Sequence, residues 1–395
     1  IKGHPWITLD QYSEKFHPKD KFIVASNRRK PFALLLHDPT HLNVKARVWS
    51  TGGNFQNQIK SFKNDLITRI RQAVKRRTES TYIKDRNHFY LVFAEADNIP
   101  GVLVHYLNGK ILIQFYMTFW DQYREFFIQN LIKAVNEVMK KDIEDEIDYE
   151  NIWIQERSAL KEPAKCSDPN TSFRNIEIEE FGVKYKVTIG KYYDHGIYTD
   201  MSSIRSRIEN DLKGAKSLLN LFCYTGAFSV QALHLGLEKV NSVDLSGPYL
   251  EWLEKNIELN PSIDKSKHTS MEMSAKDALK KLKGTDEKFD FVICDPPSSS
   301  SDGNKRTNAL AEYKELLPMI DNALTDHGKA IVFINTHTCT MKKFEDKIRQ
   351  TITQKKLPLI IKNKYYLSQD CPYKKGFPEG NYLKGLLLIK NDSSK

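Results

Sequence analysis

The chain has 395 residues, a net charge of +10 at pH 7 and a pI near 9.1. This length predicts two or three domains with substantial cores, and the basic charge suits a polyanionic partner, although proteins that bind no nucleic acid can also be basic. No apolar run approaches the length of a membrane span and no signal peptide is visible, which argues against a helical membrane protein. Because the first residue is Ile, a natural start and a targeting segment could lie upstream.

The cysteines give no sign of a metal site. They occur singly, at positions 166, 223, 294, 339 and 371. No CxxC pair and no Cys/His cluster with zinc spacing is present, so we expect no metal, and a reduced, cytoplasmic compartment is the simpler interpretation.

The beginning of the chain predicts short β-strands separated by turns. The apolar pieces are 21–25, 32–36 and 44–49. The turn between the first two contains Arg28, Arg29 and Lys30, which could contact phosphates through charge without reading a base sequence. A solvated turn between two strands is the alternative, and the residues alone favour it.

Residues 57–77 predict an amphipathic basic helix, with apolar residues at helical spacing and basic residues on the remaining faces. Such a helix could lie along RNA or simply pack on a sheet. Further elements then follow in order: strands at 89–95, 102–106 and 110–115, a helix at 122–140, a strand at 152–155, a polar linker at 157–174, and a hairpin of 176–180 with 185–189.

The stretch from Leu218 to Asp244 is the most informative part of the chain. An apolar run is followed by a turn at Gly226, a helical pattern, and a second apolar run that ends in Asp244, which predicts strand, turn, helix and strand. Eighteen positions separate Gly226 from Asp244, close to the spacing between a nucleotide-binding turn and an acidic ribose ligand. Only one glycine is present, so a ligand with a ribose and no phosphate, such as S-adenosylmethionine, fits better than a dinucleotide. An ordinary βαβ unit is the alternative.

A second stretch, 289–297, predicts a buried parallel strand that runs directly into Asp295, Pro296 and Pro297. A carboxylate is thereby placed at the carboxyl edge of the sheet, where open α/β folds bind their ligands. The two prolines stiffen the loop that carries it.

Together these motifs resemble the class I S-adenosylmethionine-dependent ribosomal RNA methyltransferases. The whole chain is similar to the large-subunit enzymes with an N-terminal PUA domain, the methyltransferase I type, and the catalytic half also resembles the guanine-N7 half of the fused methyltransferase K/L. This resemblance implies a small β-barrel PUA-like domain at 1–56, a central α+β domain and linker at 57–172, and a doubly wound α/β, Rossmann-like methyltransferase domain at 173–395.

The resemblance also implies the residues that bind the cofactor, S-adenosylmethionine. They are Asp200, Arg205, Asn220, Phe222, Tyr224, Gly226, Asp244, Leu245, Asp277 and Asp295. Asp244 would take the ribose hydroxyls and Asp277 the adenine amino group. In the segment before the sheet, Ser202 replaces the first arginine of the family's D-x-R-x-x-R pattern, so one cofactor contact could be absent.

The methyl acceptor depends on the end of the strand 329–335. Methylation of cytosine at carbon 5 requires a cysteine that first attacks carbon 6. The resemblance places Asn335 where the cytosine-5 relatives have that cysteine, and Cys339 or Cys294 could replace it only with a shifted backbone. Guanine N7 can attack the sulfonium directly, so positioning and desolvation can supply most of its catalysis.

We therefore expect a cytoplasmic methyltransferase that modifies a base of large-subunit (23S) ribosomal RNA, with guanine N7 favoured over cytosine carbon 5. Asp295, Pro296, Pro297 and Asn335 would form its catalytic end. Arg28, Arg29, Lys30, Lys305 and Arg306 would bind RNA, and Tyr313, Phe377 or Tyr382 could stack on a flipped base. A non-catalytic RNA-binding scaffold is the main alternative and small-molecule methylation a weaker one; we expect no membrane partner, and the sequence leaves a homodimer open.

Overall fold

The computed structural model describes residues 3–78, 84–141, 143, 145–157, 162–301 and 306–391. The chain forms two compact units that are not continuous in sequence. The first contains Ile1–Ile178, Val187–His195 and Gln369–Gly380, and the second contains Glu179–Lys186, Gly196–Ser368 and Asn381–Lys395.

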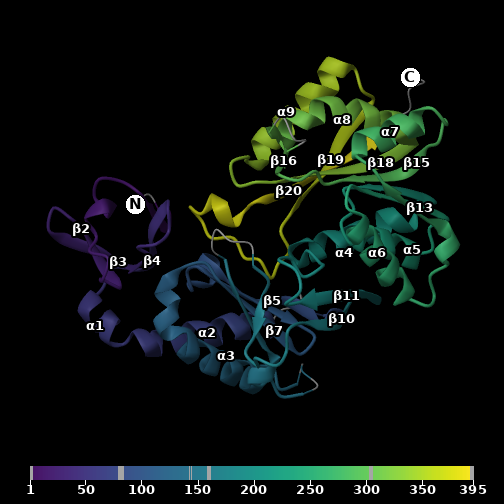
Figure 1. The fold of residues 1–395 in the computed structure, drawn as a ribbon. Coiled ribbons are helices and arrows are strands. Elements are labelled where there is room, and N and C mark those ends of the chain that lie inside the picture. The colour runs from purple at the N-terminus through teal and green to yellow at the C-terminus, as the bar shows by residue number, and fades with distance from the viewer. Residues whose placement is uncertain are drawn as a thin grey trace. The chain divides into compact units, whose positions relative to one another are not determined.

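The first unit begins with a four-stranded antiparallel sheet in the order β1-β4-β3-β2 (Figure 1). Its strands are β1 (Trp6–Thr8), β2 (Phe22–Asn27), β3 (Lys30–His37) and β4 (Val44–Thr51). Leu34 and Leu36 pack into the large core of the unit, whereas Ala33 and Leu35 pack into a small cluster on the opposite face, as the two-residue period of a strand requires. The predicted strands are confirmed. Over the described residues the sheet is open, with β1 and β2 as its edges, so the PUA barrel stays a prediction.

The predicted basic helix is confirmed as two pieces, α1 (Phe55–Lys60) and α2 (Phe62–Thr78). Phe62, Leu66 and Ile70 form one buried face of α2. Several of its arginines bind carboxylates of the same unit: Arg69 contacts Asp65, Arg71 contacts Glu137, and Arg76 and Arg77 both contact Asp97. The arginines of α2 therefore mainly form ion pairs that stabilise the first unit.

A five-stranded sheet in the order β5-β6-β7-β8-β9 completes the first unit. Its strands are β5 (His88–Phe93), β6 (Val102–Leu107), β7 (Lys110–Phe115), β8 (Ile152–Glu156) and β9 (Lys165–Cys166), and α3 (Arg124–Val138) connects β7 to the parallel β8. These elements were predicted, except β9, which lies inside the stretch expected to be a linker. The predicted hairpin is present as β10 (Arg174–Glu180) and β11 (Val183–Ile189).

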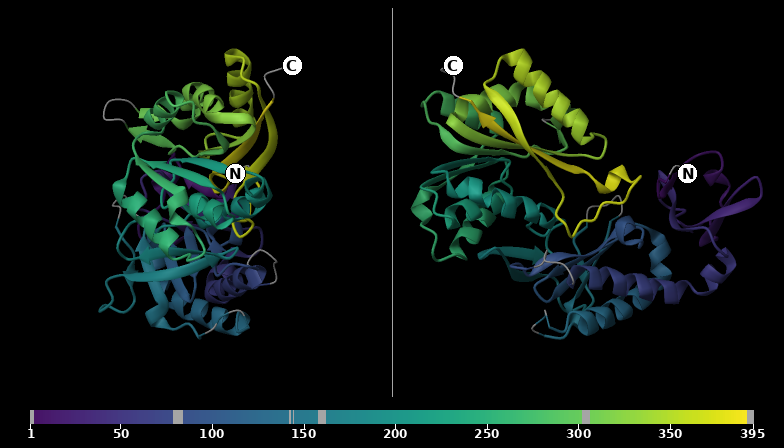
Figure 2. Two further views of the ribbon diagram at one scale, coloured as in Figure 1. Left: turned by 90° about the vertical axis from the view of Figure 1, so that its right-hand side faces the viewer. Right: turned by 180° about the vertical axis from the view of Figure 1, so that it is seen from behind.

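The second unit contains a seven-stranded sheet in the order β14-β13-β12-β15-β18-β20-β19. Strands β14 (His268–Glu272), β13 (Lys239–Asp244), β12 (Ser217–Leu221), β15 (Phe289–Cys294) and β18 (Leu324–Asn335) are parallel, and β20 (Leu383–Lys390) and β19 (Leu359–Tyr366) are antiparallel to their neighbours. Figure 2 shows the yellow C-terminal strand lying against the green strands of this sheet.

Helices cover both faces of this sheet, as predicted for a doubly wound fold (Figure 1). One layer contains α7 (Ala275–Lys283), α8 (Ala309–Ala323) and α9 (Met341–Lys355), whose apolar faces share a core with the strands. The other contains α4 (Ser202–Lys213), α5 (Ala227–His234) and α6 (Gly247–Glu258). The strand order reverses between β12 and β15, and a reversal of this kind leaves a crevice at the carboxyl ends of the strands.

The segment Gln369–Gly380 leaves the second unit between β19 and β20 and belongs to the first. Asp370 anchors it there: its carboxylate accepts hydrogen bonds from Arg86 at 2.8 Å and from the backbone N–H of Tyr90 at 2.9 Å. The Arg86 and Asp370 side chains are both 1% exposed. None of the helices that the structure describes is long and apolar enough to cross a membrane.

Candidate active site

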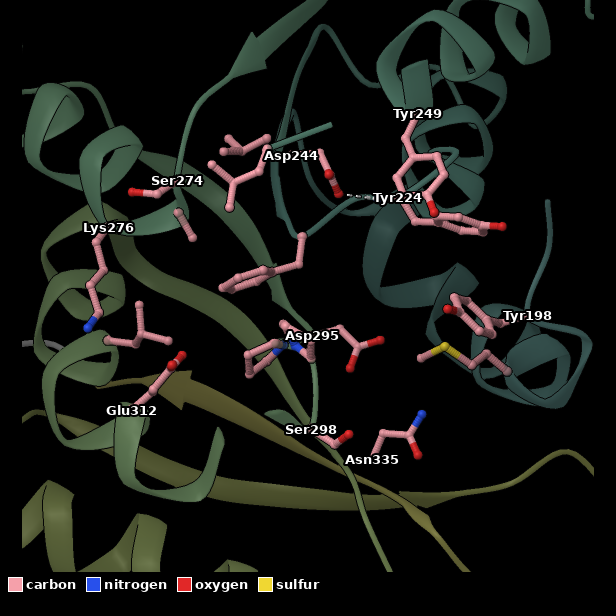
Figure 3. A pocket seen from close by; sticks show the side chains of 18 of the residues that line it. Tyr198, Tyr224, Asp244, Tyr249, Ser274, Lys276, Asp295, Ser298, Glu312 and Asn335 are labelled. Carbon is pink, nitrogen blue, oxygen red and sulfur yellow. Dashed lines mark hydrogen bonds between the residues drawn. The ribbon is translucent and has the colours of Figure 1, made fainter. Parts of the chain in front are cut away.

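A cavity of about 360 Å³ lies at the carboxyl ends of β12, β13, β15 and β18, at the crevice described above (Figure 3). It belongs wholly to the second unit. The predicted site residues among those that line it are Asp200, Phe222, Tyr224, Asp244, Leu245, Asp295, Pro296, Pro297 and Asn335. Residues from several distant motifs therefore meet around one space large enough for a small-molecule ligand.

The turn after β12 has an unusual backbone. Phe222 and Tyr224, which both line the cavity, have φ values of 59° and 52°, in the left-handed region that disfavours residues with a Cβ. Gly226 follows at φ 78° and precedes α5. A Cβ on Gly226 would lie 2.3 Å from Leu253, so only glycine fits there. Backbone strain is thus concentrated where the sequence predicted a ligand-binding turn.

Asp244 ends β13 with its carboxylate at the cavity. It accepts hydrogen bonds from the backbone N–H of Tyr224 at 2.9 Å and from that of Ser246 at 3.0 Å. Burial raises the pKa of this carboxyl, while the backbone donors oppose the increase. The carboxylate therefore joins the turn after β12 to the end of β13, and it is placed to accept hydrogen bonds from hydroxyl groups of a ligand.

Asp295 follows β15 and points into the same cavity (Figure 3). Burial, together with the nearby charge of Asp200, raises the pKa of Asp295 to about 7. Asp200 is itself buried and accepts a hydrogen bond from the hydroxyl of Tyr382 at 2.6 Å. Two carboxylates thus face one partly desolvated space, an arrangement that favours a cationic ligand.

Asn335 is the last residue of β18, where its exposed side chain reaches the cavity (Figure 3). It pairs in register with Leu383 of β20, which also lines the cavity. Its amide can donate and accept hydrogen bonds, but it cannot act as a covalent nucleophile.

A family model described as S-adenosylmethionine-dependent methyltransferase matches residues 154–352, about half of the chain. The chain belongs to the S-adenosylmethionine-dependent methyltransferases. Among the curated relatives, the Bacillus subtilis protein named "Putative ribosomal RNA large subunit methyltransferase YwbD" is 28% identical over 98% of this chain and 96% of its own length. "Ribosomal RNA large subunit methyltransferase I" of Vibrio vulnificus is 25% identical over 98% of this chain and 95% of its own length.

A solved structure shares the fold over nearly the whole methyltransferase chain. The structure of SMU.776 complexed with SAH has a TM-score of 0.81 and 19% identity, and the match covers 98% of this chain and 96% of that one. The two chains therefore share one fold.

The residues of the cavity fit S-adenosylmethionine, which supplies an activated methyl group on a positively charged sulfur. Asp244 can accept the ribose hydroxyls, and Asp200 with Asp295 gives the carboxylates that a sulfonium needs nearby. Phe222 and Tyr224 form the wall between these carboxylates. The turn at Gly226 leaves no room for a side chain behind that wall.

Four of the predicted cofactor residues do not line the main cavity: Arg205, Asn220, Gly226 and Asp277. Asn220 donates a hydrogen bond to Ser229 at 2.9 Å, and Arg205 forms a buried ion pair with Glu180. Both line a smaller hollow of about 40 Å³ that Phe222 and Tyr224 also line, so they lie next to the wall of the main cavity. Gly226 likewise acts through the backbone of its turn.

The prediction for Asp277 is not supported by its position. Its side chain is 63% exposed and is not among the residues that line the cavity. Ser274 and Asp277 cap the beginning of α7: the Asp277 N–H donates to the Ser274 hydroxyl at 3.1 Å, and that hydroxyl lies 2.7 Å from the Asp277 carboxylate. Ser274, Ala275 and Lys276 line the cavity in its place.

Sequence reasoning predicted Tyr224 at the cavity but missed two further tyrosines on the same wall, Tyr198 and Tyr249. Tyr198, Tyr224 and Tyr249 come from three different elements, and Figure 3 shows them together. The ring centroids of Tyr198 and Tyr224 are 5.1 Å apart, and those of Tyr224 and Tyr249 are 4.6 Å apart. Tyr198 lies two residues before Asp200 and Tyr249 lies five residues after Asp244, and this closeness to predicted ligands is the only signal that the sequence gives for them.

The cysteines near the site are poorly placed for nucleophilic catalysis. Cys223, Cys294 and Cys339 are buried, and none is among the residues that line the cavity. Cys294 packs into the core beneath α8, on the opposite face of β15, as predicted. Burial raises the pKa of all three thiols, which disfavours the thiolate form that attacks carbon.

Two of the three proposed stacking residues are excluded by their positions. Tyr313 is fully buried, and its hydroxyl bridges the backbone carbonyls of Cys294 and Phe333. Phe377 is buried in the first unit, where it packs against Trp6. Tyr382, which is half-buried beside Asp200, is the remaining one of the three.

The predicted RNA contacts lie outside this cavity. Arg28, Arg29 and Lys30 are exposed at the turn between β2 and β3. Lys305 lies outside the described residues, and of Arg306 only the backbone, in β17 (Arg306–Asn308), is described. Within the part of the chain that is described, no group of three or more His, Cys, Asp or Glu residues could hold a metal ion.

Proposed function

We propose that this methyltransferase transfers the methyl group of S-adenosylmethionine to a base of large-subunit ribosomal RNA, and that the acceptor is N7 of guanine. The names of the relatives support the RNA class, because the match covers 98% of this chain. The net charge of +10 agrees with a polyanionic substrate.

The choice of guanine N7 as the acceptor rests on which side chains line the cavity. Asp295 and Asn335 reach the cavity, whereas none of the described cysteines lines it. The lone pair of guanine N7 can take the methyl group directly: an N–C bond forms, the C–S bond breaks, and the electron pair stays on sulfur. No proton has to leave the base, and no covalent bond to the enzyme is needed.

In this proposal the residues act by position and charge. Asn335 can donate a hydrogen bond to guanine O6 and thereby hold N7 in line with the methyl group. Methylation at N7 makes the base cationic, and the carboxylate of Asp295 at the cavity stabilises that charge as it develops. Pro296 and Pro297 restrict the loop that carries Asp295.

The RNA would also contact the first unit, for which we keep the PUA-like assignment as part of the proposal. Arg28 and Arg29 form the tip of the β2–β3 hairpin with φ values of 47° and 64°. A two-residue turn of this kind normally contains Asn and Gly, because both positions need a positive φ. Two arginines there accept backbone strain and present two guanidinium groups to the solvent, which supports a binding role.

The test is nucleoside mass spectrometry of large-subunit ribosomal RNA incubated with the enzyme and isotopically labelled cofactor. We expect label in 7-methylguanosine, retained in Cys339→Ala and Cys294→Ala and lost by at least tenfold in Asn335→Ala. Label in 5-methylcytidine that disappears with Cys339→Ala would establish the covalent alternative. Cofactor binding without methylation of any RNA base would favour a non-catalytic scaffold.

A further inference from the structure

A shallow groove of about 490 Å³ lies on the surface of the second unit between the beginnings of α8 and α9. Lys342, Lys343 and Lys347 of α9 line it, together with Leu310 of α8. Asp346 is the one carboxylate among its described lining residues. The groove is therefore cationic, and the cofactor cavity has no part in it.

The groove begins at the same edge of the sheet as the cavity. Asn335 ends β18 at the cavity, and the chain then reaches Thr340, which caps α9 and lines the groove. Leu310 of α8 lines the groove, whereas Glu312, about 3 Å further along the same helix, lines the cavity. A chain molecule with one residue in the cavity would have its neighbouring residues close to the groove.

The register of α9 fixes the direction of the lysines. Phe344, Ile348 and Thr351 form its buried face, at the spacing of successive helical turns. Lys343 and Lys347 are one position before two of these residues and therefore lie beside the buried face, at the margin of the groove. The packing of the helix thus places these lysines at the groove.

The three groove lysines form no ion pair within the part of the chain that the structure describes. Across the described residues, no carboxylate forms an ion pair with Lys342, Lys343 or Lys347. On another face of the same helix, Glu345 binds both Arg349 and Lys364. The groove lysines can therefore exchange water and counterions for an external anion at little cost.

We propose that the groove between α8 and α9 binds phosphate groups of the RNA strand that flanks the methylated nucleotide. This inference rests on the proposed function, since the cavity would hold the acceptor base and the strand must continue past its edge. A polynucleotide provides phosphates at regular intervals, which suits ammonium groups on successive turns of a helix.

The test compares the triple variant Lys342→Gln, Lys343→Gln, Lys347→Gln with a control that removes the same charge from the far end of α9 and from β19, namely Lys355→Gln, Lys356→Gln, Lys362→Gln. Binding of a single-stranded 20-nucleotide RNA and of protein-free large-subunit RNA is measured at several salt concentrations with the full chain. Each lost phosphate contact lowers affinity about fivefold at 0.1 M salt and reduces the salt slope by about 0.7. We expect at least a tenfold loss of affinity in the groove variant and less than a threefold loss in the control.

The affinity for S-adenosylmethionine and the unfolding temperature should stay the same in both variants, since none of these lysines touches the cavity or the core. If the wild type methylates ribosomal RNA but the groove variant binds RNA as tightly as the control, the groove proposal is wrong and the proposed function stands. If the wild type binds RNA through the groove lysines but methylates none, the proposed function is wrong. If the groove variant binds RNA normally but no longer binds polyglutamate, the ligand of the groove is an acidic protein and not RNA.

Discussion

At the scale of single residues, Asp295 couples the charge of the ligand to the protonation of the site. Its pKa of about 7 means that near neutral pH the carboxyl is partly protonated when no cation is present. A sulfonium in the cavity favours the ionised form, so binding of S-adenosylmethionine should release a proton. The product, S-adenosylhomocysteine, has a neutral sulfur and gives no such preference.

We therefore predict that the affinity for S-adenosylmethionine rises about tenfold from pH 6 to pH 8, as the ionised fraction of Asp295 rises from about one tenth to about nine tenths. The affinity for S-adenosylhomocysteine should change less than about threefold. Isothermal titration calorimetry at pH 6, 7 and 8 measures both ligands, whose shared amino group makes each a control for the other. In Asp295→Asn the two pH profiles should coincide, and a steep profile that persists in this variant would refute the assignment.

The turn at Gly226 gives a second prediction at this scale, because Gly236 is a matched control. Both glycines have a positive φ, 78° and 90°, but a Cβ at Gly236 would meet nothing within 4 Å, whereas at Gly226 it would meet Leu253. Gly236→Ala should cost about 1–2 kcal/mol from backbone strain alone. Gly226→Ala adds a steric clash of about 1–3 kcal/mol and should weaken cofactor binding. Urea unfolding measures the loss of stability, and cofactor titration measures the loss of affinity. If the two variants lose the same free energy of unfolding, the contact with Leu253 relaxes without cost.

At the scale of elements, the β2–β3 hairpin should separate stability from binding. Replacing Arg28-Arg29 with Asn-Gly gives the turn its preferred residues and should raise the free energy of unfolding by about 1 kcal/mol. The same change removes two guanidinium groups and should weaken RNA binding by roughly tenfold at 0.1 M salt. Arg28→Lys with Arg29→Lys keeps charge and strain, so both properties should stay near those of the wild type. Unchanged RNA affinity in the Asn-Gly variant would leave the arginines without a role in binding.

The elements that the sequence predicted well are those encoded by local pattern. The strand, turn and helix around Gly226, and the strand that ends in Asp295, need only the order of apolar, glycine and acidic residues. The role predicted for Asp277 is not supported for a local reason as well: its carboxylate forms a helix cap with Ser274, and its side chain does not line the cavity. The type of element was predictable there, and the direction of one side chain was not.

Long-range pairing was the part that pattern could not supply. The basic helix α2 allowed two interpretations from its spacing alone, and the structure favours the packed one because Glu137 and Asp97 bind its arginines. Asp97 lies about twenty residues from these arginines, beyond the reach of a helical repeat. Tyr198 and Tyr249 of the cavity wall were missed for the same reason, since they come from separate parts of the chain.

At the scale of the whole molecule, the compact units are built from separate segments of the chain and not from successive domains. The sequence predicts domains at 1–56, 57–172 and 173–395, whereas the compact units exchange segments at the hairpin β10–β11 and again at Gln369–Gly380. Leu34 and Leu36 of the first sheet share one core with α2 and the central strands, so residues 1–178 form one compact unit. No periodicity in 369–380 indicates that it returns to this unit, because separate side chains such as Asp370, Lys374 and Phe377 hold it there rather than a helical or strand pattern.

This connectivity predicts that the two units unfold together and that Asp370 controls the transition. Asp370→Asn leaves the guanidinium of Arg86 buried without its carboxylate, which costs about 3–5 kcal/mol. Release of 369–380 also turns the connection between β19 and β20 into a free loop. The entropy lost on closing this loop then lowers the free energy of unfolding of the second unit. Differential scanning calorimetry should show a single transition that shifts several degrees lower in Asp370→Asn.

The control is Lys374→Met, which lies in the same segment and should shift the transition far less. The partly exposed amine of Lys374 bonds to Asn98 and to the Glu95 carbonyl. Two separate transitions, with the one sensitive to S-adenosylmethionine unmoved by Asp370→Asn, would mean that the exchanged segments do not couple the units.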